Sequence, residues 1–112
     1  MRSPITTHVL DTASGRPARA VMVVLERLEG TFREVAKGIT NEDGRIADML
    51  PPGEVPTGTY RISFDTGAYY RAQGLPVFYP SVSITFEVDA ADEHYHVPLL
   101  LSPYGYSTYR GS

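Results

Sequence analysis

The segment His94-Tyr95-His96-Val97-Pro98-Leu99-Leu100-Leu101 is an apolar run that carries two of the three histidines in the sequence. Its composition is typical of a β-strand, and Ser102-Pro103 predicts a corner before a last strand over residues 104–110. Pro98 has no N–H to give to a neighbouring strand, so we expect an edge position or a bulge there. The sequence therefore predicts that the chain ends in two consecutive strands.

The end of the chain, Tyr109-Arg110-Gly111-Ser112, is aromatic, cationic and small, with no run of solubilising charge. Most chains end in a frayed tail that can be removed without effect. This composition instead indicates a terminus that is docked on the protein and used.

Strand patterns recur through the rest of the chain, over residues 5–11, 21–25, 31–40, 45–49, 59–65 and 81–88. The clearest alternation places Tyr60, Ile62 and Phe64 on one face. One short helix is expected over residues 68–73, capped by Asp65 or Thr66 and closed by Gly74. About eight short strands with one helix predict an all-β fold, a β-sandwich.

Composition limits the classes of function. With 112 residues the chain makes one domain, residues 1–112, and it has no cysteine for disulfides, thiolate metal sites or nucleophiles. The net charge of −3 gives no basic surface for nucleic acid, and no apolar run approaches the roughly 20 residues of a membrane span. Residues 1–4 lead directly into a strand-like segment, so we expect no secretory signal and a cytoplasmic location.

The histidines are the first candidates for chemistry. His94 and His96 are two residues apart, so both point to the same face of an extended strand, and His8 lies in the middle of the first strand. Two histidines at this spacing with a third elsewhere could bind zinc, and they could equally be polar positions on a solvated face. The spacing alone leaves both interpretations open.

Arg45 and the C-terminal tyrosines are weaker candidates. Arg45 follows the turn Asn41-Glu42-Asp43-Gly44 and is either a solvated hairpin residue or a fixed cation for a planar anion. Tyr104, Tyr106 and Tyr109 crowd the last strand, where packing or an interface is the usual role of tyrosine. The residues alone thus predict a sandwich with a candidate histidine, arginine and tyrosine cluster.

Taken together, residues 5–18, 40–45 and 94–112 resemble the signatures of the transthyretin family, over essentially the whole chain. They are most similar to its enzymatic branch, the 5-hydroxyisourate hydrolases of urate degradation. The terminal Tyr109-Arg110-Gly111-Ser112 is the part most specific to these hydrolases. Hormone-carrying transthyretins lack it and lack these histidines, while they share the stretch Leu100-Leu101-Ser102-Pro103-Tyr104.

The resemblance implies a transthyretin-like (prealbumin-like) sandwich of two four-stranded sheets with one short helix. It implies a homotetramer, a dimer of dimers, whose active sites lie in a central channel and use residues of more than one subunit. His8, Arg45 and His96 would be catalytic, and His8, Arg45, Tyr109, Arg110, Gly111 and Ser112 would bind the substrate. His94 is expected to have a supporting or surface role.

The implied reaction hydrolyses 5-hydroxyisourate, a purine-derived small molecule, to 2-oxo-4-hydroxy-4-carboxy-5-ureidoimidazoline, with no metal or other cofactor. His8 or His96 would be the general base and Arg45 the fixed cation. The alternatives are a transthyretin-like carrier of a small ligand, without catalysis, and a structural or interaction domain. The histidines and the terminal tail favour the enzyme.

Overall fold

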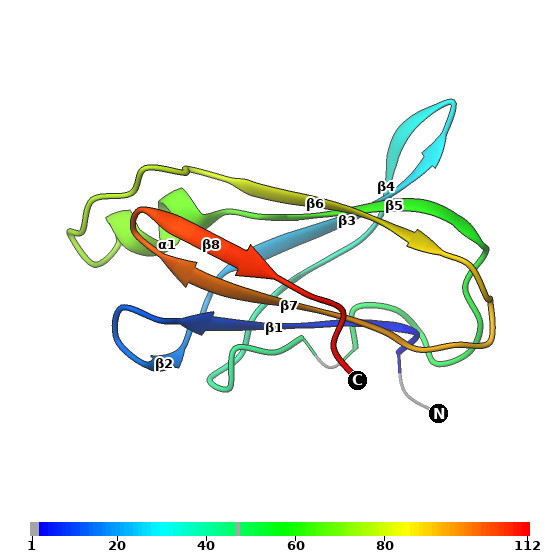
Figure 1. The fold of residues 1–112 in the computed structure, drawn as a ribbon, viewed down its shortest axis with the longest axis horizontal. Coiled ribbons are helices and arrows are strands. Elements are labelled where there is room, and N and C mark those ends of the chain that lie inside the picture. The colour runs from blue at the N-terminus through cyan, green and yellow to red at the C-terminus, as the bar shows by residue number, and fades with distance from the viewer. Residues whose placement is uncertain (1–2, 47) are drawn as a thin grey trace.

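The computed structural model describes residues 3–46 and 48–112, which form eight strands and one helix (Figure 1). One sheet has the order β2-β1-β7-β8 and the other β4-β3-β5-β6. Their bounds are β1 Ile5–Asp11, β2 Arg16–Pro17, β3 Met22–Glu29, β4 Thr31–Ile39, β5 Gly58–Phe64, α1 Thr66–Arg71, β6 Val82–Val88, β7 Tyr95–Ser102 and β8 Gly105–Thr108. The expected sandwich of two four-stranded sheets with one short helix is therefore confirmed.

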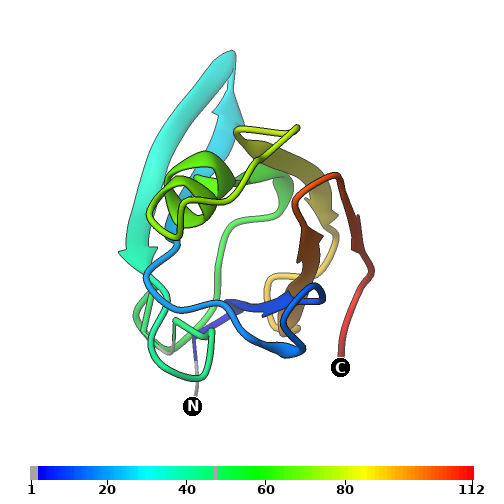
Figure 2. The same ribbon diagram turned by 90° about the vertical axis from the view of Figure 1, so that its left-hand side faces the viewer.

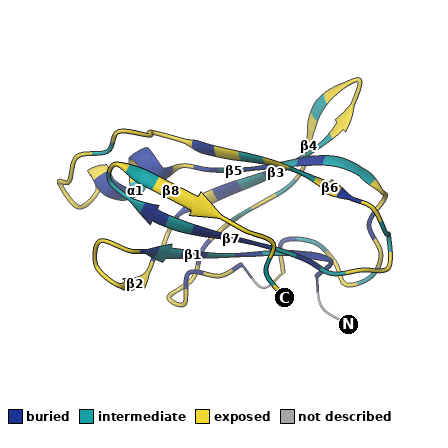
Figure 3. Ribbon diagram, viewed as in Figure 1, coloured by how far each residue is buried: buried dark blue, intermediate teal, exposed yellow. Residues whose placement is uncertain are grey.

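The two sheets pack face to face around one apolar core, and α1 lies at one end between them (Figure 2). Alternation along the inner strands sends every second side chain inward, as on β5, where Tyr60, Ile62 and Phe64 are all buried. Figure 3 shows the inward positions as buried, whereas β8 is mostly exposed. The core thus depends on the strand periodicity that the sequence displays.

The first strand and the penultimate strand run parallel, side by side in the middle of their sheet. Their register pairs Thr6 with His96, His8 with Pro98 and Leu10 with Leu100. Residues paired in this way have side chains on the same face of the sheet, and here it is the face directed away from the core. The pairing therefore brings histidines from opposite ends of the chain to one outer surface.

Helix α1 begins at Thr66 after the N-cap Asp65, whose carboxylate accepts from the Ala68 N–H over 3.0 Å. It ends before Gly74, which has a positive φ of 69°, as the sequence predicts. Its tyrosines reach the first sheet: Tyr69 and Tyr70 donate their hydroxyls to the buried Asp11 carboxylate over 2.8 and 3.1 Å. These bonds fix the end of β1 against the helix.

Three local expectations need correction. The turn after β1 contains the two-residue strand β2, paired with Leu10 and Asp11, which has too few residues to show a periodicity. The strand expected over residues 45–49 does not form in its described part, where Arg45 makes only a single β-bridge to His8. Ala47, within this expected strand, lies outside the described residues. Met1 and Arg2, at the expected N-terminal lead, also lie outside them. Turn geometry at Asp48 and Met49 ends any extension.

Pro98 lies in an inner strand, between β1 and β8, so the expected edge or bulge is wrong. The last β7–β8 pair joins Leu99 to Thr108, and Pro98 lies between this pair and the isolated His96–Gly111 bridge. The Pro98 carbonyl accepts from the Thr108 hydroxyl over 2.7 Å. The missing N–H therefore removes no bond from the β7–β8 pairs that do form.

Candidate active site

The outer face of the β1–β7 pair presents Thr6, His8 and His96. Both histidines are half-buried, so their rings stay partly accessible to a ligand. The Thr6 hydroxyl lies 2.8 Å from Nδ1 of His96 and 2.9 Å from Nε2 of His94. Two strands that are distant in sequence thus hold a polar cluster in fixed register.

The turn at residues 41–44 carries Arg45 to this cluster. The Asn41 side-chain oxygen accepts from the N–H groups of Asp43 and Arg45 over 2.9 and 3.1 Å, which shapes the turn. Gly44 has a φ of +73°, and its carbonyl accepts from the Val9 N–H over 2.8 Å, which attaches the turn to β1. The backbone of Arg45 then forms an isolated antiparallel β-bridge with His8, which places the two residues side by side.

The C-terminal tail returns to the same place. The Gly111 N–H donates to the His96 carbonyl over 2.9 Å, and Ser112 lines the cavity beside His96. The expected docking of the terminus is present for these two residues.

A cavity of about 380 Å³ opens between these elements, large enough for a small planar heterocycle. Its lining is mostly polar and consists of Thr6, Thr7, Asn41, Asp43, Arg45, Ile46, His94, His96 and Ser112. Arg45 makes no ion pair with any residue that the structure describes, so its guanidinium is available to a ligand. The cavity can therefore hold a polar ring between imidazole and guanidinium groups.

The surroundings keep both candidate histidines neutral near pH 7. Burial, and then the positive charge of Arg45, lower the pKa of His96 below its ordinary value, with smaller contributions from His94 and His8. Burial and Arg45 likewise lower the pKa of His8, opposed by the hydrogen bond and charge of Asp43. A neutral imidazole is the form that can accept a proton from water.

Two of the expected substrate-binding residues point elsewhere within the chain. Arg110 pairs with Glu93 over 3.0 Å, and its guanidinium carbon lies 4.5 Å from the centre of the Tyr95 ring. Tyr109 is exposed and, with Arg110, lines a separate cavity of about 210 Å³ on the other side of His96. The structure thus brings together Arg45, His96 and Ser112 with His8 and Gly111 alongside, and leaves Tyr109 and Arg110 outside the 380 Å³ cavity.

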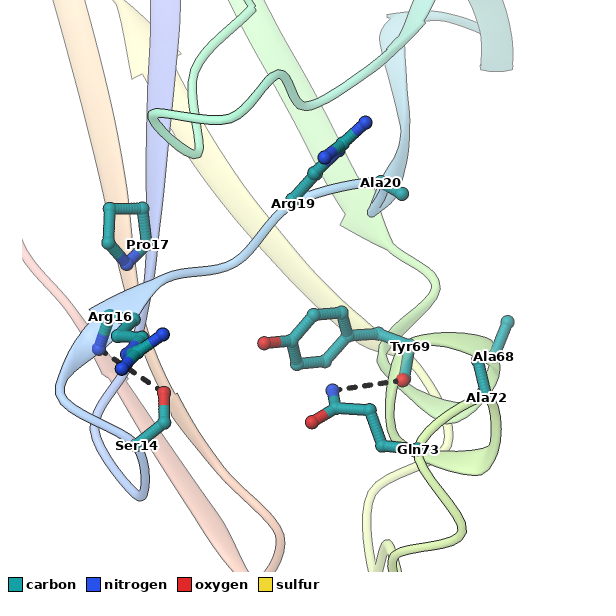
Figure 4. Close-up of a pocket in the computed structure, with 9 residues that line it drawn as sticks. All are labelled: Ser14, Arg16, Pro17, Arg19, Ala20, Ala68, Tyr69, Ala72 and Gln73. Carbon is teal, nitrogen blue, oxygen red and sulfur yellow. Dashed lines mark hydrogen bonds between the residues drawn. The ribbon is translucent and has the colours of Figure 1, made fainter.

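A larger cavity of about 730 Å³ lies between the β1–β2 turn and α1 (Figure 4). Arg16, Arg19, Tyr69 and Gln73 border it, and none of the three histidines does. It is an open surface hollow without a candidate base, so the chemistry is better placed in the smaller cavity. Within residues 3–46 and 48–112, no group of three or more metal-ligating side chains is placed to hold a metal ion, and no helix is long and apolar enough to cross a membrane.

Sequence reasoning did not single out Thr6, Thr7, Asn41 or Asp43, which border the cavity. Thr6 had one usable signal, because it stands two residues from His8 and so shares its face. Asn41 and Asp43 were visible only as turn residues.

Comparison with known proteins assigns the chain to a family. The model of the HIUase/Transthyretin family matches residues 5–111. The chain belongs to this family. A 5-hydroxyisourate hydrolase 2 of Rhizobium meliloti (strain 1021) is 52% identical over 114 residues, covering 96% of this chain and 95% of that protein.

Solved structures of the HIUase/Transthyretin family agree with this fold. Klebsiella pneumoniae 5-hydroxyisourate hydrolase superposes with a TM-score of 0.87 at 38% identity, covering 98% of this chain and all of that one. Sea bream transthyretin in complex with thyroxine gives a TM-score of 0.90 at 31% identity, covering 97% and 95%. Since both similarities are high, the fold alone does not separate a hydrolase from a carrier, and the site must decide.

Proposed function

We propose that this protein hydrolyses 5-hydroxyisourate to 2-oxo-4-hydroxy-4-carboxy-5-ureidoimidazoline, with no metal cofactor. The observation that carries the proposal is that His96 and Arg45 line one cavity, where Arg45 forms no ion pair with a described residue, while the backbone of His8 forms a β-bridge with that of Arg45. The similarity to proteins named 5-hydroxyisourate hydrolase supports the same substrate.

In the proposed reaction, His8 or His96 accepts a proton from water as the water oxygen attacks the ring carbonyl carbon. The carbon–nitrogen bond of the cyclic amide then breaks, and the imidazolium returns its proton to the departing nitrogen. The other histidine orients the water or the substrate. A lowered histidine pKa suits the first step, because the base is unprotonated before the water arrives.

Arg45 would offset the negative charge that develops on the carbonyl oxygen. The backbone of Arg45 is held by the bonds of the preceding turn, so the side chain starts from a fixed point beside the cavity. Removal of one such donor typically costs about a hundredfold or more in rate.

The proposed assembly is a homotetramer, a dimer of dimers, in which facing subunits close the open sites. The cavity lies on the outer face of the β1–β7 pair, so a second subunit is needed to cover a bound substrate. Gly111 and Ser112 would contact the substrate in their own subunit. Tyr109 and Arg110 would line the site from another subunit. The cytoplasmic location of the protein stays a prediction.

The test is an assay in which urate oxidase generates 5-hydroxyisourate in the cuvette. This protein is added with a metal chelator, and the ultraviolet absorbance of the substrate is followed against its spontaneous decay. Faster decay at catalytic protein concentration supports a metal-independent hydrolase. Decay at the spontaneous rate would favour the carrier, for which the thyroxine complex of a similar fold is the specific precedent.

Three variants test the residue roles: His8→Ala, Arg45→Ala and His96→Ala should each lose most activity while staying folded. Arg33→Ala is the matched control, because Arg33 is exposed on β4 in the opposite sheet. Near-normal turnover in any two of the three site variants would refute the assignment.

A further inference from the structure

Beyond the candidate catalytic residues, a continuous line of hydrogen bonds leads to His96. Nδ1 of His94 lies 2.9 Å from the Ser3 carbonyl oxygen, and Nε2 of His94 lies 2.9 Å from the Thr6 hydroxyl. The Thr6 hydroxyl in turn lies 2.8 Å from Nδ1 of His96. Three bonds therefore join a buried backbone carbonyl to one ring nitrogen of the candidate base.

When His94 is neutral, the carbonyl at one end fixes the direction of every bond in this line. A carbonyl oxygen only accepts, so Nδ1 of His94 must carry its hydrogen. A neutral imidazole has one N–H, which leaves Nε2 of His94 as an acceptor for the Thr6 hydroxyl hydrogen. The hydroxyl has a single hydrogen, so it can only accept from His96, and Nδ1 of His96 must be the donor.

We propose that Thr6 and His94 are positioning residues that hold neutral His96 with its hydrogen on Nδ1, so that Nε2 is the basic atom. The catalytic meaning of this arrangement rests on the proposed hydrolase function, whereas the position of the hydrogen does not. A base must present its lone pair to water, and a histidine in the opposite tautomer presents an N–H instead.

The backbone holds these three side chains in place. Thr6 and His96 are register partners in the parallel β1–β7 pair, and His94 precedes β7 by one residue. The rings of His94 and His96 are nearly parallel, with an interplanar angle of 15° and centres 6.5 Å apart. The Thr6 hydroxyl can thus reach both rings without a backbone change, because it lies 2.9 and 2.8 Å from their nearest nitrogens.

The experiment is long-range ¹H–¹⁵N NMR of the imidazole nitrogens at a pH where His96 is neutral, together with kcat and KM. Wild-type protein should show an N–H nitrogen at Nδ1 of His96 and an unprotonated nitrogen at Nε2. Thr6→Val removes the hydroxyl at nearly constant volume, and His94→Gln removes the ring that receives its hydrogen. Both should populate the second tautomer and lower kcat by about tenfold or more with little change in KM.

Thr6→Ser keeps the hydroxyl and should restore both the tautomer and kcat. Thr85→Val is the matched control, because Thr85 is exposed on β6 of the other sheet. If neutral wild-type His96 carries its hydrogen on Nε2, or if Thr6→Val leaves a folded protein with the tautomer unchanged, the inference is overturned. An inactive wild-type protein with the expected tautomer would instead refute the proposed function and leave the inference standing.

Discussion

Gly111 and His96 face each other across a single bridge that continues the β7–β8 register beyond Pro98. Leu99 pairs with Thr108, and three residues further on His96 pairs with Gly111, so no residue is gained or lost between them. The contact is close: a Cβ placed on Gly111 would lie 2.5 Å from Cδ2 of the His96 ring. The position of Gly111 therefore limits the position of the His96 ring, the candidate base.

Gly111→Ala should displace the His96 ring, because real Cβ atoms do not approach a ring carbon so closely. We expect hydrolysis to slow by about tenfold or more, with little change in thermal midpoint because the substitution lies next to the terminus. Gly105→Ala is the control, since its Cβ would meet only the Ser102 hydroxyl oxygen, at 3.7 Å. Equal activity in the two variants would show that the tail does not position His96.

Deletion of residues 109–112 should abolish hydrolysis while the sandwich stays folded. The deletion removes the Gly111 bond to His96 and the Ser112 side of the cavity, and it spares every strand. Circular dichroism and steady-state kinetics on the shortened chain are the measurements. An active truncated protein would contradict the assignment of the tail to the site.

The lowered pKa values of His8 and His96 predict a dependence on pH. The folded protein binds protons at these rings less readily than the unfolded chain, so their contribution to stability is present above pH 6.5 and is lost as the pH falls through the folded pKa. Because Arg45 is one cause, Arg45→Gln should raise the NMR titration midpoint of both rings. Arg33→Gln should leave them where they are, and the same result for Arg45→Gln would contradict this electrostatic account.

Gly44→Ala should be more harmful than Gly30→Ala, although both glycines have positive φ, 73° and 77°. At Gly30 an added Cβ meets nothing within 4 Å, so only backbone strain of about 1–2 kcal/mol is expected. At Gly44 the Cβ would collide with the Val9 carbonyl oxygen and push the turn away from β1. Denaturant unfolding should therefore show the larger loss for Gly44→Ala, and activity should fall because Arg45 moves with the turn.

Tyr70→Phe should destabilise the fold by about 1–3 kcal/mol, because it withdraws a donor from the Asp11 carboxylate, whose residue is only 2% exposed. Burial and the Asp11 bond raise the pKa of the neighbouring Tyr69 to about 12, and burial and the Asp11 charge also raise the pKa of Tyr70. The hydroxyls of Tyr69 and Tyr70 therefore stay protonated donors at neutral pH. Tyr104→Phe, at a tyrosine that is 69% exposed, is the control for urea unfolding. Equal stability of the two variants would mean that the bond contributes nothing net.

Periodicity and turn chemistry allowed most of the fold to be predicted. The alternation of Tyr60, Ile62 and Phe64 and the Asp65 cap are local signals, and both are confirmed. The prediction of an edge or bulge at Pro98 failed because it depended on strand partners that are distant in the sequence. Pro98 is acceptable in an inner strand because it lies between the Leu99–Thr108 pair and the His96–Gly111 bridge and belongs to neither, and nothing near Pro98 in the sequence reveals that.

For the site, the sequence could supply candidates but not their connections. His8, Arg45 and His96 were identified as residue types able to do the chemistry, through family resemblance. The coupling of Thr6 to His94 and His96 spans 88 and 90 positions and depends on the parallel register, which periodicity does not encode. The Arg110 side chain lies outside the 380 Å³ cavity because it pairs with Glu93 and stacks on the Tyr95 ring. These contacts are equally invisible in a linear pattern.

The parallel pairing of β1 with β7 also has a consequence for biosynthesis. The strand that carries His8 is made first, and the strand that carries His96 is made only after some 80 further residues. During vectorial synthesis the β3–β4 and β5–β6 hairpins can close early, whereas β1 has only the two-residue strand β2 beside it until β7 has been made. Catalytic competence should thus appear only after β7 and the segment that follows it have left the ribosome, and a chain released before β7 would lack one of the two inner strands of that sheet.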